Sequence, residues 1–180
     1  IYLATLAPKS LHFTGAAADG WLGTSFSPDH AEAHLAHIRA GAESAGKSLH
    51  DIFLNAACTV AIGDDVEGLI DKLRPGVAFQ MGAMGSANTN FYNDAFKRAG
   101  YTDDALAIQD LWLKGKRDEA AKRVPDAMVT EFGAIGTAAM VRDRFQAYAD
   151  VGINGLTLRI VPGADGHSAT LEQTMDLLSR

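Results

Sequence analysis

The sequence contains a single cysteine, Cys58, which lies inside an apolar run, so no disulfide framework can form. A lone thiol of this kind is typical of a reducing compartment, and we expect the cytoplasm. No stretch approaches the roughly 18 consecutive apolar residues of a membrane-spanning helix. The start of the chain also lacks the basic segment and apolar segment of a secretory signal. We therefore expect no membrane partner.

Positive charge is also scarce. The sequence has 16 Lys and Arg against 22 Asp and Glu, which gives a formal net charge of −6 at pH 7. Proteins that bind nucleic acids neutralise phosphates with a basic patch or stripe, and the sequence contains no such stripe. We therefore expect no nucleic-acid partner.

Signatures of nucleophilic hydrolysis and of P-loop phosphate binding are missing as well. The chain has no Gly-x-Ser-x-Gly elbow, and Cys58 lies in the middle of a predicted strand, so hydrolysis has no support. The glycine-rich stretch 82–86 lacks the Gly-Lys-Ser/Thr of a P-loop. We interpret it as a turn that ends a helix, with Asn88 and Asn90 as caps of the next helix.

Three histidines, His30, His34 and His37, share one face of a predicted helix at residues 29–46 and raise the possibility of a metal site. Their spacing differs from the His-Glu-x-x-His arrangement of zinc metalloproteases. They border the apolar stripe of the helix and do not lie within it. We therefore favour an exposed helix edge over a metal site.

The most informative segment is the first, residues 1–25. Residues 1–6 form a short apolar run typical of a buried strand, residues 7–10 interrupt it, a short helix follows, and residues 21–24 begin a second strand. A parallel β-α-β unit brings the loop after its first strand to the C-terminal edge of a sheet, where α/β folds bind ligands. The chain starts inside this strand without an initiating Met, which indicates a fragment or a processed product.

The rest of the sequence alternates helices and strands of unequal length. Further strands are predicted at 52–62 and 155–161, which makes four, and four parallel strands are half of an eight-stranded barrel. Residues 77–127 contain no convincing strand and look like a helical insertion between the last two strands. The predicted helices are 29–46, one from 63 to a break or kink at 74–76, 90–99, 103–114, 118–123, 137–152, and a last helix with Leu171, Met175 and Leu178 on its apolar face.

The predicted strand at 52–62 has two unlike faces. One face is wholly aliphatic and the other carries Asn55 and Thr59, which suits a barrel strand whose aliphatic side meets the outer helices. On the last strand, Arg159 alternates with apolar neighbours and is expected to face the barrel interior as well. There it either holds an anionic substrate or pairs with a carboxylate, and we favour the pair.

Several segments, taken together and in this order, are similar to one known family. They are residues 1–9, Ala18-Asp19-Gly20-Trp21, Met84-Gly85 with Asn90-Phe91-Tyr92, and Gly136-Thr137 followed by Tyr148, Gly152 and 156–158. In these segments the sequence resembles the luciferase-like monooxygenase superfamily, and within it the oxidoreductases that use the deazaflavin coenzyme F420. The resemblance implies a TIM barrel, of which residues 1–180 look like the C-terminal half, from about the fifth strand to the eighth, with the insertion at about 77–127. It also implies hydride transfer between F420 and a small organic molecule.

The resemblance places the cofactor side of the site in this chain. At the end of the second predicted strand, Thr24 and Ser25 match positions near the cofactor and the substrate mouth. Amides at a helix N-terminus favour an anion, and small residues permit a close approach. In the family, the loop after the fifth barrel strand lays such amides against the phosphate-bearing cofactor tail, a role that falls here on Thr5, Leu6, Ala7, Pro8 and Lys9.

The family's catalytic residues lie mostly on the early strands, so none is named in this chain, and we expect the 180-residue chain alone to be inactive. Family members that oxidise sugar phosphates place a lysine close to Ser27, so the uncharged serine disfavours such a substrate. Two alternatives stay open: an FMN-dependent monooxygenase, and a non-catalytic flavin-binding or interaction module. Because a half-barrel exposes its sheet edges, we also expect a homo-oligomer, most simply a dimer.

Overall fold

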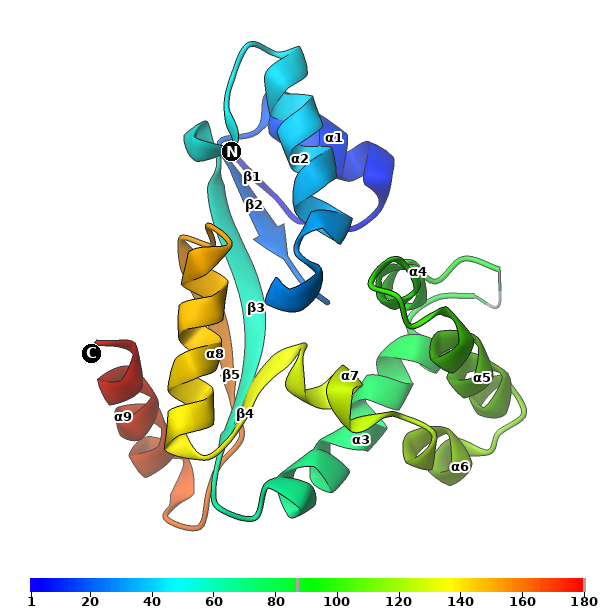
Figure 1. Ribbon diagram of the computed structural model, residues 1–180. Coiled ribbons are helices and arrows are strands. Elements are labelled where there is room, and N and C mark those ends of the chain that lie inside the picture. The colour runs from blue at the N-terminus through cyan, green and yellow to red at the C-terminus, as the bar shows by residue number, and fades with distance from the viewer. Residues whose placement is uncertain (87, 180) are drawn as a thin grey trace.

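A parallel sheet forms the centre of the computed structural model, which describes residues 1–86 and 88–179 (Figure 1). All of its strand pairs are parallel, so the C-terminal ends of the strands face the same side of the fold. In chain order, the strands of the described residues are β1 (Tyr2–Leu3), β2 (Gly20–Gly23), β3 (Phe53–Ile62), β4 (Gly133–Gly136) and β5 (Gly155–Ile160).

The long strand β3 holds the sheet together. Its first residues pair with β2, its last residues, 59–62, pair with β4, and residues 55–60 pair with β5. The short strand β1 pairs with β2 at the edge of the sheet. Each of the other strands is therefore placed by β3, directly or through β2.

The first strand is shorter than predicted. Of residues 1–6, the structure assigns only Tyr2 and Leu3 to the sheet, and the following residues form a loop before Pro8. Proline holds the residue before it in an extended conformation, and Ala7 has φ −82° and ψ 149°. The backbone thus stays extended toward Pro8 while leaving the strand ladder.

Four helices pack with the aliphatic face of β3. The two helices at residues 8–17 and 32–44 approach each other closely. A Cβ on Gly15 would lie 1.9 Å from the carbonyl oxygen of Ile38, and one on Gly41 would lie 1.8 Å from that of His12. Only glycine allows this contact. The helices are α1 (Pro8–Ala17), α2 (Glu32–Ser44), α8 (Ala138–Asp150) and α9 (Gly166–Leu178), and short 3-10 helices lie at η1 (Pro28–His30) and η2 (Leu49–Asp51).

The two faces of β3 differ as the sequence predicts. Leu54, Ala56, Cys58 and Val60 are buried in one core with the side chains of the outer helices. On the opposite face Asn55 and Thr59 are half-buried. The hydroxyl of Thr157 on β5 donates to the side-chain oxygen of Asn55 at 2.8 Å, so polar contacts tie the strands on this face.

A second core lies under the helical segment that follows β3. It packs on the other face of the sheet, where Ala61 and Ile135 belong to it, and Figure 1 shows its helices grouped beside the sheet. The sequence predicts no strand in residues 77–127. Among the described residues of this segment, the only strand-like pairing is an isolated bridge between Ser86 and Thr89, which agrees with the prediction. The helices are α3 (Val66–Ala83), α4 (Phe91–Arg98), α5 (Thr102–Leu113), α6 (Arg117–Lys122) and α7 (Asp126–Thr130).

One strand was not predicted. β4 contains only Gly-Ala-Ile-Gly, a composition with little intrinsic strand preference, yet all four residues are buried and pair with the end of β3. The prediction of four strands was therefore wrong: the described residues form five, and the helical segment lies between the third and fourth of them. Tertiary pairing, which the local sequence does not reveal, creates this strand.

The sequence predicted a break or a kink at 74–76, and the break was wrong. The helix continues through Pro75 to Ala83, although proline removes one backbone donor. Leu73, Ala78 and Met81 on both sides of the proline are buried in the second core. Packing along the whole helix thus outweighs the local cost of the proline.

The last helix turns a different face inward from the one predicted. Leu171, Met175 and Leu178 are exposed, whereas Thr170, Thr174 and Leu177 are buried. The threonine hydroxyls are satisfied locally, because Thr170 donates to the carbonyl of Gly166 at 2.9 Å and Thr174 to that of Thr170 at 2.7 Å. Local hydrogen bonding therefore lets threonines occupy the inner face.

Among the described residues, no helix combines the length and the apolar character that crossing a membrane requires.

Candidate cofactor site

A pocket of about 580 Å³ opens beside the loop between β1 and α1. Because this loop and the end of β2 both follow strands at their C-terminal ends, the pocket lies at the edge of the sheet where α/β folds bind ligands. Three parts of the chain line it: residues 4–7 with Lys9 and Ser10, then Leu22 and Thr24 of the β2 segment, and finally Phe91 and Tyr92 of α4.

Side chains from outside the loop fix its backbone. The indole Nε1 of Trp21 donates to the carbonyl of Thr5 at 2.9 Å, and Arg98 Nη2 donates to the carbonyl of Leu6 at 2.7 Å. The hydroxyls of Thr5 and Thr14 lie 2.7 Å apart. The Thr5 hydroxyl is therefore hydrogen-bonded to α1, and the carbonyls of Thr5 and Leu6 already accept hydrogen bonds from within the protein.

The start of α1 gives the pocket its electrostatic character. Pro8 is the first helical residue and Ala7, the N-cap, offers no side-chain hydrogen bond to the first turn. The first N–H groups of a helix have no partner within the helix, and together with the helix dipole they attract an anion. The Lys9 side chain is exposed at the same end. This end of the pocket is therefore suited to a negatively charged group.

Arg98 adds positive charge behind the loop. Burial lowers the pKa of its guanidinium, while the carboxylate of Asp94 acts in the opposite direction. Its Nε is buried and makes no hydrogen bond with any described residue. Arg98 forms no ion pair within the part of the chain that the structure describes. Its charge is thus left to act on the loop and on what the loop binds.

Most of the predicted cofactor residues meet at this pocket. Thr5, Leu6, Ala7, Lys9 and Thr24 line it, whereas Pro8 begins α1 and does not. Their contact with a cofactor stays a prediction. The structure adds lining residues that sequence reasoning did not assign to the site.

Phe91 and Tyr92 are the main residues that the site prediction missed. They begin α4, which lies more than eighty positions from the loop in sequence, so no local pattern joins them to it. Asn90 caps this helix, accepting from the backbone N–H of Tyr92 at 3.1 Å and of Asn93 at 3.0 Å. Its amide donates to the carbonyl of Met81 at 2.7 Å. The predicted Asn90 cap is confirmed, and it fixes the two aromatic residues. Asn88 makes no capping hydrogen bond with a residue that the structure describes.

The chain bends sharply after Thr24. Ser25 has φ +50°, a left-handed conformation that costs a serine free energy, and it is 9% exposed. Its hydroxyl is buried and makes no hydrogen bond with a described residue. Thr24 lines the pocket, while Ser25, its predicted companion, is turned into the protein beside it.

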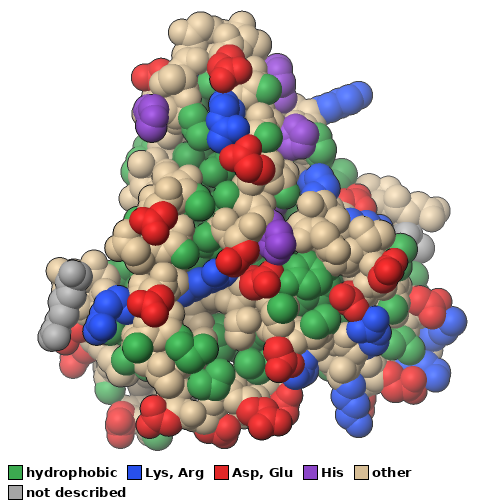
Figure 2. All heavy atoms as spheres, in the orientation of Figure 1, with side chains coloured by type: hydrophobic (Ala, Val, Ile, Leu, Met, Phe, Trp, Pro, Cys, Tyr) green, Lys and Arg blue, Asp and Glu red, His purple; other side chains and the backbone are tan. Residues whose placement is uncertain are grey.

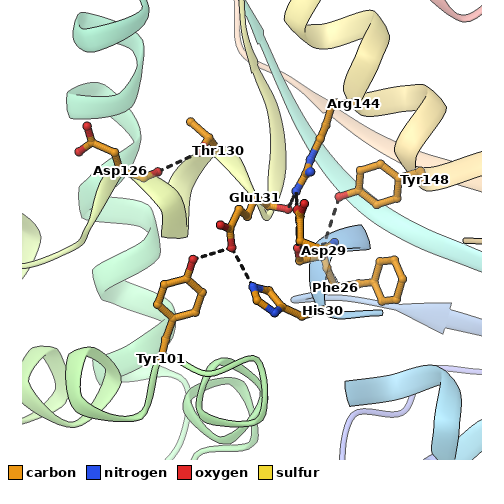
Figure 3. Close-up of polar contacts among 10 residues, drawn as sticks. Phe26, Asp29, His30, Tyr101, Asp126, Thr130, Glu131, Arg144 and Tyr148 are labelled. Carbon is orange, nitrogen blue, oxygen red and sulfur yellow. Dashed lines mark hydrogen bonds and ion pairs between the residues drawn. The ribbon is translucent and has the colours of Figure 1, made fainter. Parts of the chain in front are cut away.

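A second polar cluster follows the bend, and Figure 3 shows it. The hydroxyl of Tyr101 donates to the carboxylate of Glu131 at 2.5 Å, and the Nε2 of His30 lies 2.9 Å from the same carboxylate oxygen. Arg144 donates to the backbone carbonyl of Glu131 and lies 2.5 Å from the carboxylate of Asp29. The cluster thus joins η1, the α4–α5 turn, the turn between α7 and β4, and α8.

The charges in this cluster balance each other. Burial of Asp29 disfavours its ionisation, but the hydrogen bond and the charge of Arg144 outweigh burial and lower its pKa. Burial and the neighbouring Glu131 carboxylate raise the pKa of Tyr101 above its ordinary value. Ser27, the position where sugar-phosphate enzymes carry a lysine, is buried, and Arg144 Nη2 lies 3.5 Å from its hydroxyl. A cation does reach this place, but Asp29 neutralises it.

The histidine prediction was wrong for one of its three residues. His34 is only 2% exposed and packs between Trp21 and Phe26, with ring centroids at 5.7 and 5.8 Å. Burial, reinforced by the charges of Arg98 and His37, lowers its pKa to about 3, so the ring is neutral at ordinary pH. The described residues contain no group of three His, Cys, Asp or Glu side chains arranged to hold a metal.

The expected carboxylate partner of Arg159 was also wrong within the described residues, where no ion pair includes this arginine. Arg159 pairs in register with Thr59, so both lie on the inner face of the sheet. It lines a small hollow of about 70 Å³ with Thr59 and Gln80. Cys58 faces the opposite core, where burial raises its pKa to about 11, so it is no nucleophile.

The fold, the position of the pocket and the order of the motifs agree with a match to one family. The model of the luciferase-like monooxygenase family matches residues 1–155. The chain belongs to this family. Its fold is the α/β barrel of luciferase-like proteins, of which the chain covers about half.

Several relatives are similar over nearly the whole chain. A Mycobacterium tuberculosis protein that is assigned by name as a coenzyme F420-dependent oxidoreductase is 30% identical over 179 residues, 98% of this chain and 49% of its own length. The F420-dependent tetrahydromethanopterin reductase of Methanopyrus kandleri has a solved structure that matches with a TM-score of 0.70 at 24% identity, over 99% of this chain and 48% of that one. An F420-dependent secondary alcohol dehydrogenase matches with a TM-score of 0.67 at 15% identity, over 98% and 48%. The chain spans about half the length of these relatives.

Proposed function

We propose that the protein is a coenzyme F420-dependent oxidoreductase of the luciferase-like family and that residues 1–180 supply the C-terminal half of its barrel. The observation that carries the proposal is the pocket at the C-terminal edge of the sheet, where an uncapped helix start meets a loop of small residues. The M. tuberculosis relative, which is similar over 98% of this chain, supports F420 as the cofactor.

The residues of the pocket fit such a cofactor. Ala4 and Ala7 leave room for a ligand to approach the backbone, and the first-turn amides of α1 offer donors to a phosphate. Phe91 is 53% exposed, so its ring is free to cover an apolar part of the ligand. A ligand with an anionic group and an apolar ring system would therefore bind the α1 amides through the first and pack against Phe91 through the second.

The roles of the chain's own residues follow from this geometry. Bound in the pocket, F420 would supply or accept a hydride at its deazaflavin ring. The loop at Thr5–Lys9 binds and orients the cofactor tail, and Trp21 and Arg98 hold the loop in place. Thr24 borders the mouth where an organic substrate would enter. The general acid or base of the reaction is not assigned to any residue of this chain.

We further propose that the protein acts on a small organic molecule and assembles as a homodimer. A parallel sheet whose outer strand β1 has only two residues leaves backbone groups open to pairing. A second chain, or further strands of the same protein, would satisfy them.

The decisive experiment titrates the native-length protein with F420 and, separately, with FMN, and follows binding by fluorescence. We expect saturable F420 binding and much weaker binding of FMN. Tight binding of FMN alone would favour the FMN-dependent monooxygenase, and absence of binding by both cofactors would favour a non-catalytic module. Either result would overturn the proposal.

A further inference from the structure

A second hollow of about 350 Å³ lies next to the cofactor pocket, over α1 and α2. Pro8, Lys9, His12 and His37 line it. Lys9 lines both hollows, so a ligand that reaches the start of α1 can continue into the second one. Figure 2 shows histidine side chains on the part of the surface that α1 and α2 form.

The second hollow gathers basic groups without acidic partners. Neither Lys9, His12 nor His37 takes part in an ion pair or side-chain hydrogen bond with a described residue. This grouping is unusual in a chain whose net charge is −6. Like charges held together repel one another unless an anion binds between them.

The surrounding charges do not cancel this cluster. On α1 the only titratable side chains are Lys9 and His12. On α2, Glu32 is engaged with Arg39 at 2.8 Å, His34 is buried and neutral, and Glu43 lies more than one turn beyond His37. From α4, the half-buried Arg98 adds a further positive charge.

We propose that Lys9, His12 and His37 form a second anion subsite, which binds a carboxylate of the cofactor side chain beyond the phosphate held at the start of α1. The inference rests on the proposed use of F420, whose side chain carries glutamyl carboxylates beyond its phosphate. FMN ends at its phosphate and cannot reach the subsite. The subsite therefore favours F420 over FMN through charge located outside the ring pocket.

The test measures F420 affinity of the native-length protein and of the double variant H12Q/H37Q, which keeps polar side chains but removes two basic groups. We expect the double variant to bind F420 about tenfold more weakly at low salt, roughly threefold for each imidazole removed. Its affinity for FMN stays that of the unaltered protein. The matched control H50Q removes an exposed histidine on η2 and leaves F420 binding unchanged.

Salt dependence provides a second readout that a merely structural role would not change. Raising NaCl from low to high concentration weakens F420 binding less in H12Q/H37Q than in the unaltered protein, because fewer screened charges contribute.

An incorrect subsite and an incorrect cofactor would give different binding results. If the unaltered protein binds F420 and H12Q/H37Q binds it equally well with the same salt dependence, the subsite is wrong while the proposed function stands. If the unaltered protein does not bind F420 at all, the proposed function is wrong and the subsite is wrong with it. Thermal unfolding of each variant shows that it is folded before binding is measured.

Discussion

Two loops leave the sheet close together, and they treat positive charge in opposite ways. After β1, Arg98 and Lys9 stand beside the pocket without a carboxylate partner among the described residues. After β2, Arg144 is held by Asp29 and by the backbone carbonyl of Glu131. The first region keeps its charge available to a ligand, and the second uses its charge to join four parts of the chain. We therefore expect substitutions to affect binding in the first region and stability in the second.

The largest effect should follow from breaking the balanced region. In Arg144→Met the carboxylate of Asp29 and the carbonyl of Glu131 lose their shared partner, and the arginine side chain is only 15% exposed. We expect the free energy of unfolding to fall by about 2 kcal/mol, because Asp29 is partly solvated and the full cost of a buried pair does not apply. Denaturant unfolding measures this fall.

The matched control for Arg144 is Arg142→Met, which alters an exposed arginine on the same helix. We expect it to change the free energy of unfolding by less than about 0.5 kcal/mol. F420 affinity should stay the same in both variants. Equal unfolding free energies for the two variants would show that the Asp29–Arg144–Glu131 contacts do not stabilise the fold.

A smaller effect, this time on binding, should follow from changing the unbalanced region. Arg98→Met keeps much of the side-chain length but removes the donor to the carbonyl of Leu6 and the charge behind the loop. We expect F420 affinity to fall about tenfold, roughly 1.4 kcal/mol, because the loop is no longer held in its binding conformation. Titration by fluorescence measures the affinity.

Lys97→Met is the matched control for Arg98→Met. Lys97 is the preceding residue on α4, its ammonium lies 3.3 Å from the carboxylate of Asp94, and it is not among the residues that line the pocket. Its F420 affinity should equal that of the unaltered protein. If Arg98→Met binds F420 with unchanged affinity, the arginine does not position the loop. Its unpaired charge would then make no contribution to ligand binding.

The sequence predicts the features of the two regions that depend on neighbouring residues. It does not predict the contacts between residues that are far apart in the chain. The loop at Thr5–Lys9 is recognisable because a strand, a proline and a helix follow one another within a few residues. The contacts of Arg98 and of Phe91 with that region join segments more than eighty residues apart, and no periodicity encodes them. Sequence reasoning therefore finds the loop and not what holds it.

The same limit explains the errors in the fold. Strand β4 and the continuous helix α3 depend on pairing and packing that override local preference. The sequence predicts an exposed position for His34 because this residue borders the apolar stripe of its helix. In the structure the aromatic rings of Trp21 and Phe26 pack against it and bury it. The local hydrophobic pattern of a segment predicts whether it forms a helix or a strand. It does not predict which other segments pack against it.

The smallest expected effect is a pH dependence of stability that originates beside the first region. The pKa of His34 is lowered to about 3 by burial and by nearby Arg98 and His37, whereas an imidazole in an unfolded chain has a pKa of about 6.5. Between these values the unfolded chain binds a proton that the folded protein does not, so acid favours unfolding. The stabilising contribution is complete above about pH 6.5 and is lost progressively as the pH falls toward 3.

His34→Leu isolates this contribution, because leucine fills the space between Trp21 and Phe26 and cannot titrate. Relative to this variant, the unaltered protein should lose about 1 kcal/mol of unfolding free energy between pH 7.5 and pH 5.5. A constant difference between the unaltered protein and His34→Leu across this range would mean that His34 takes up a proton as readily in the folded protein as in the unfolded chain. Its positive charge would then add to the unbalanced region and would have to be counted with Arg98 and Lys9 in binding an anion.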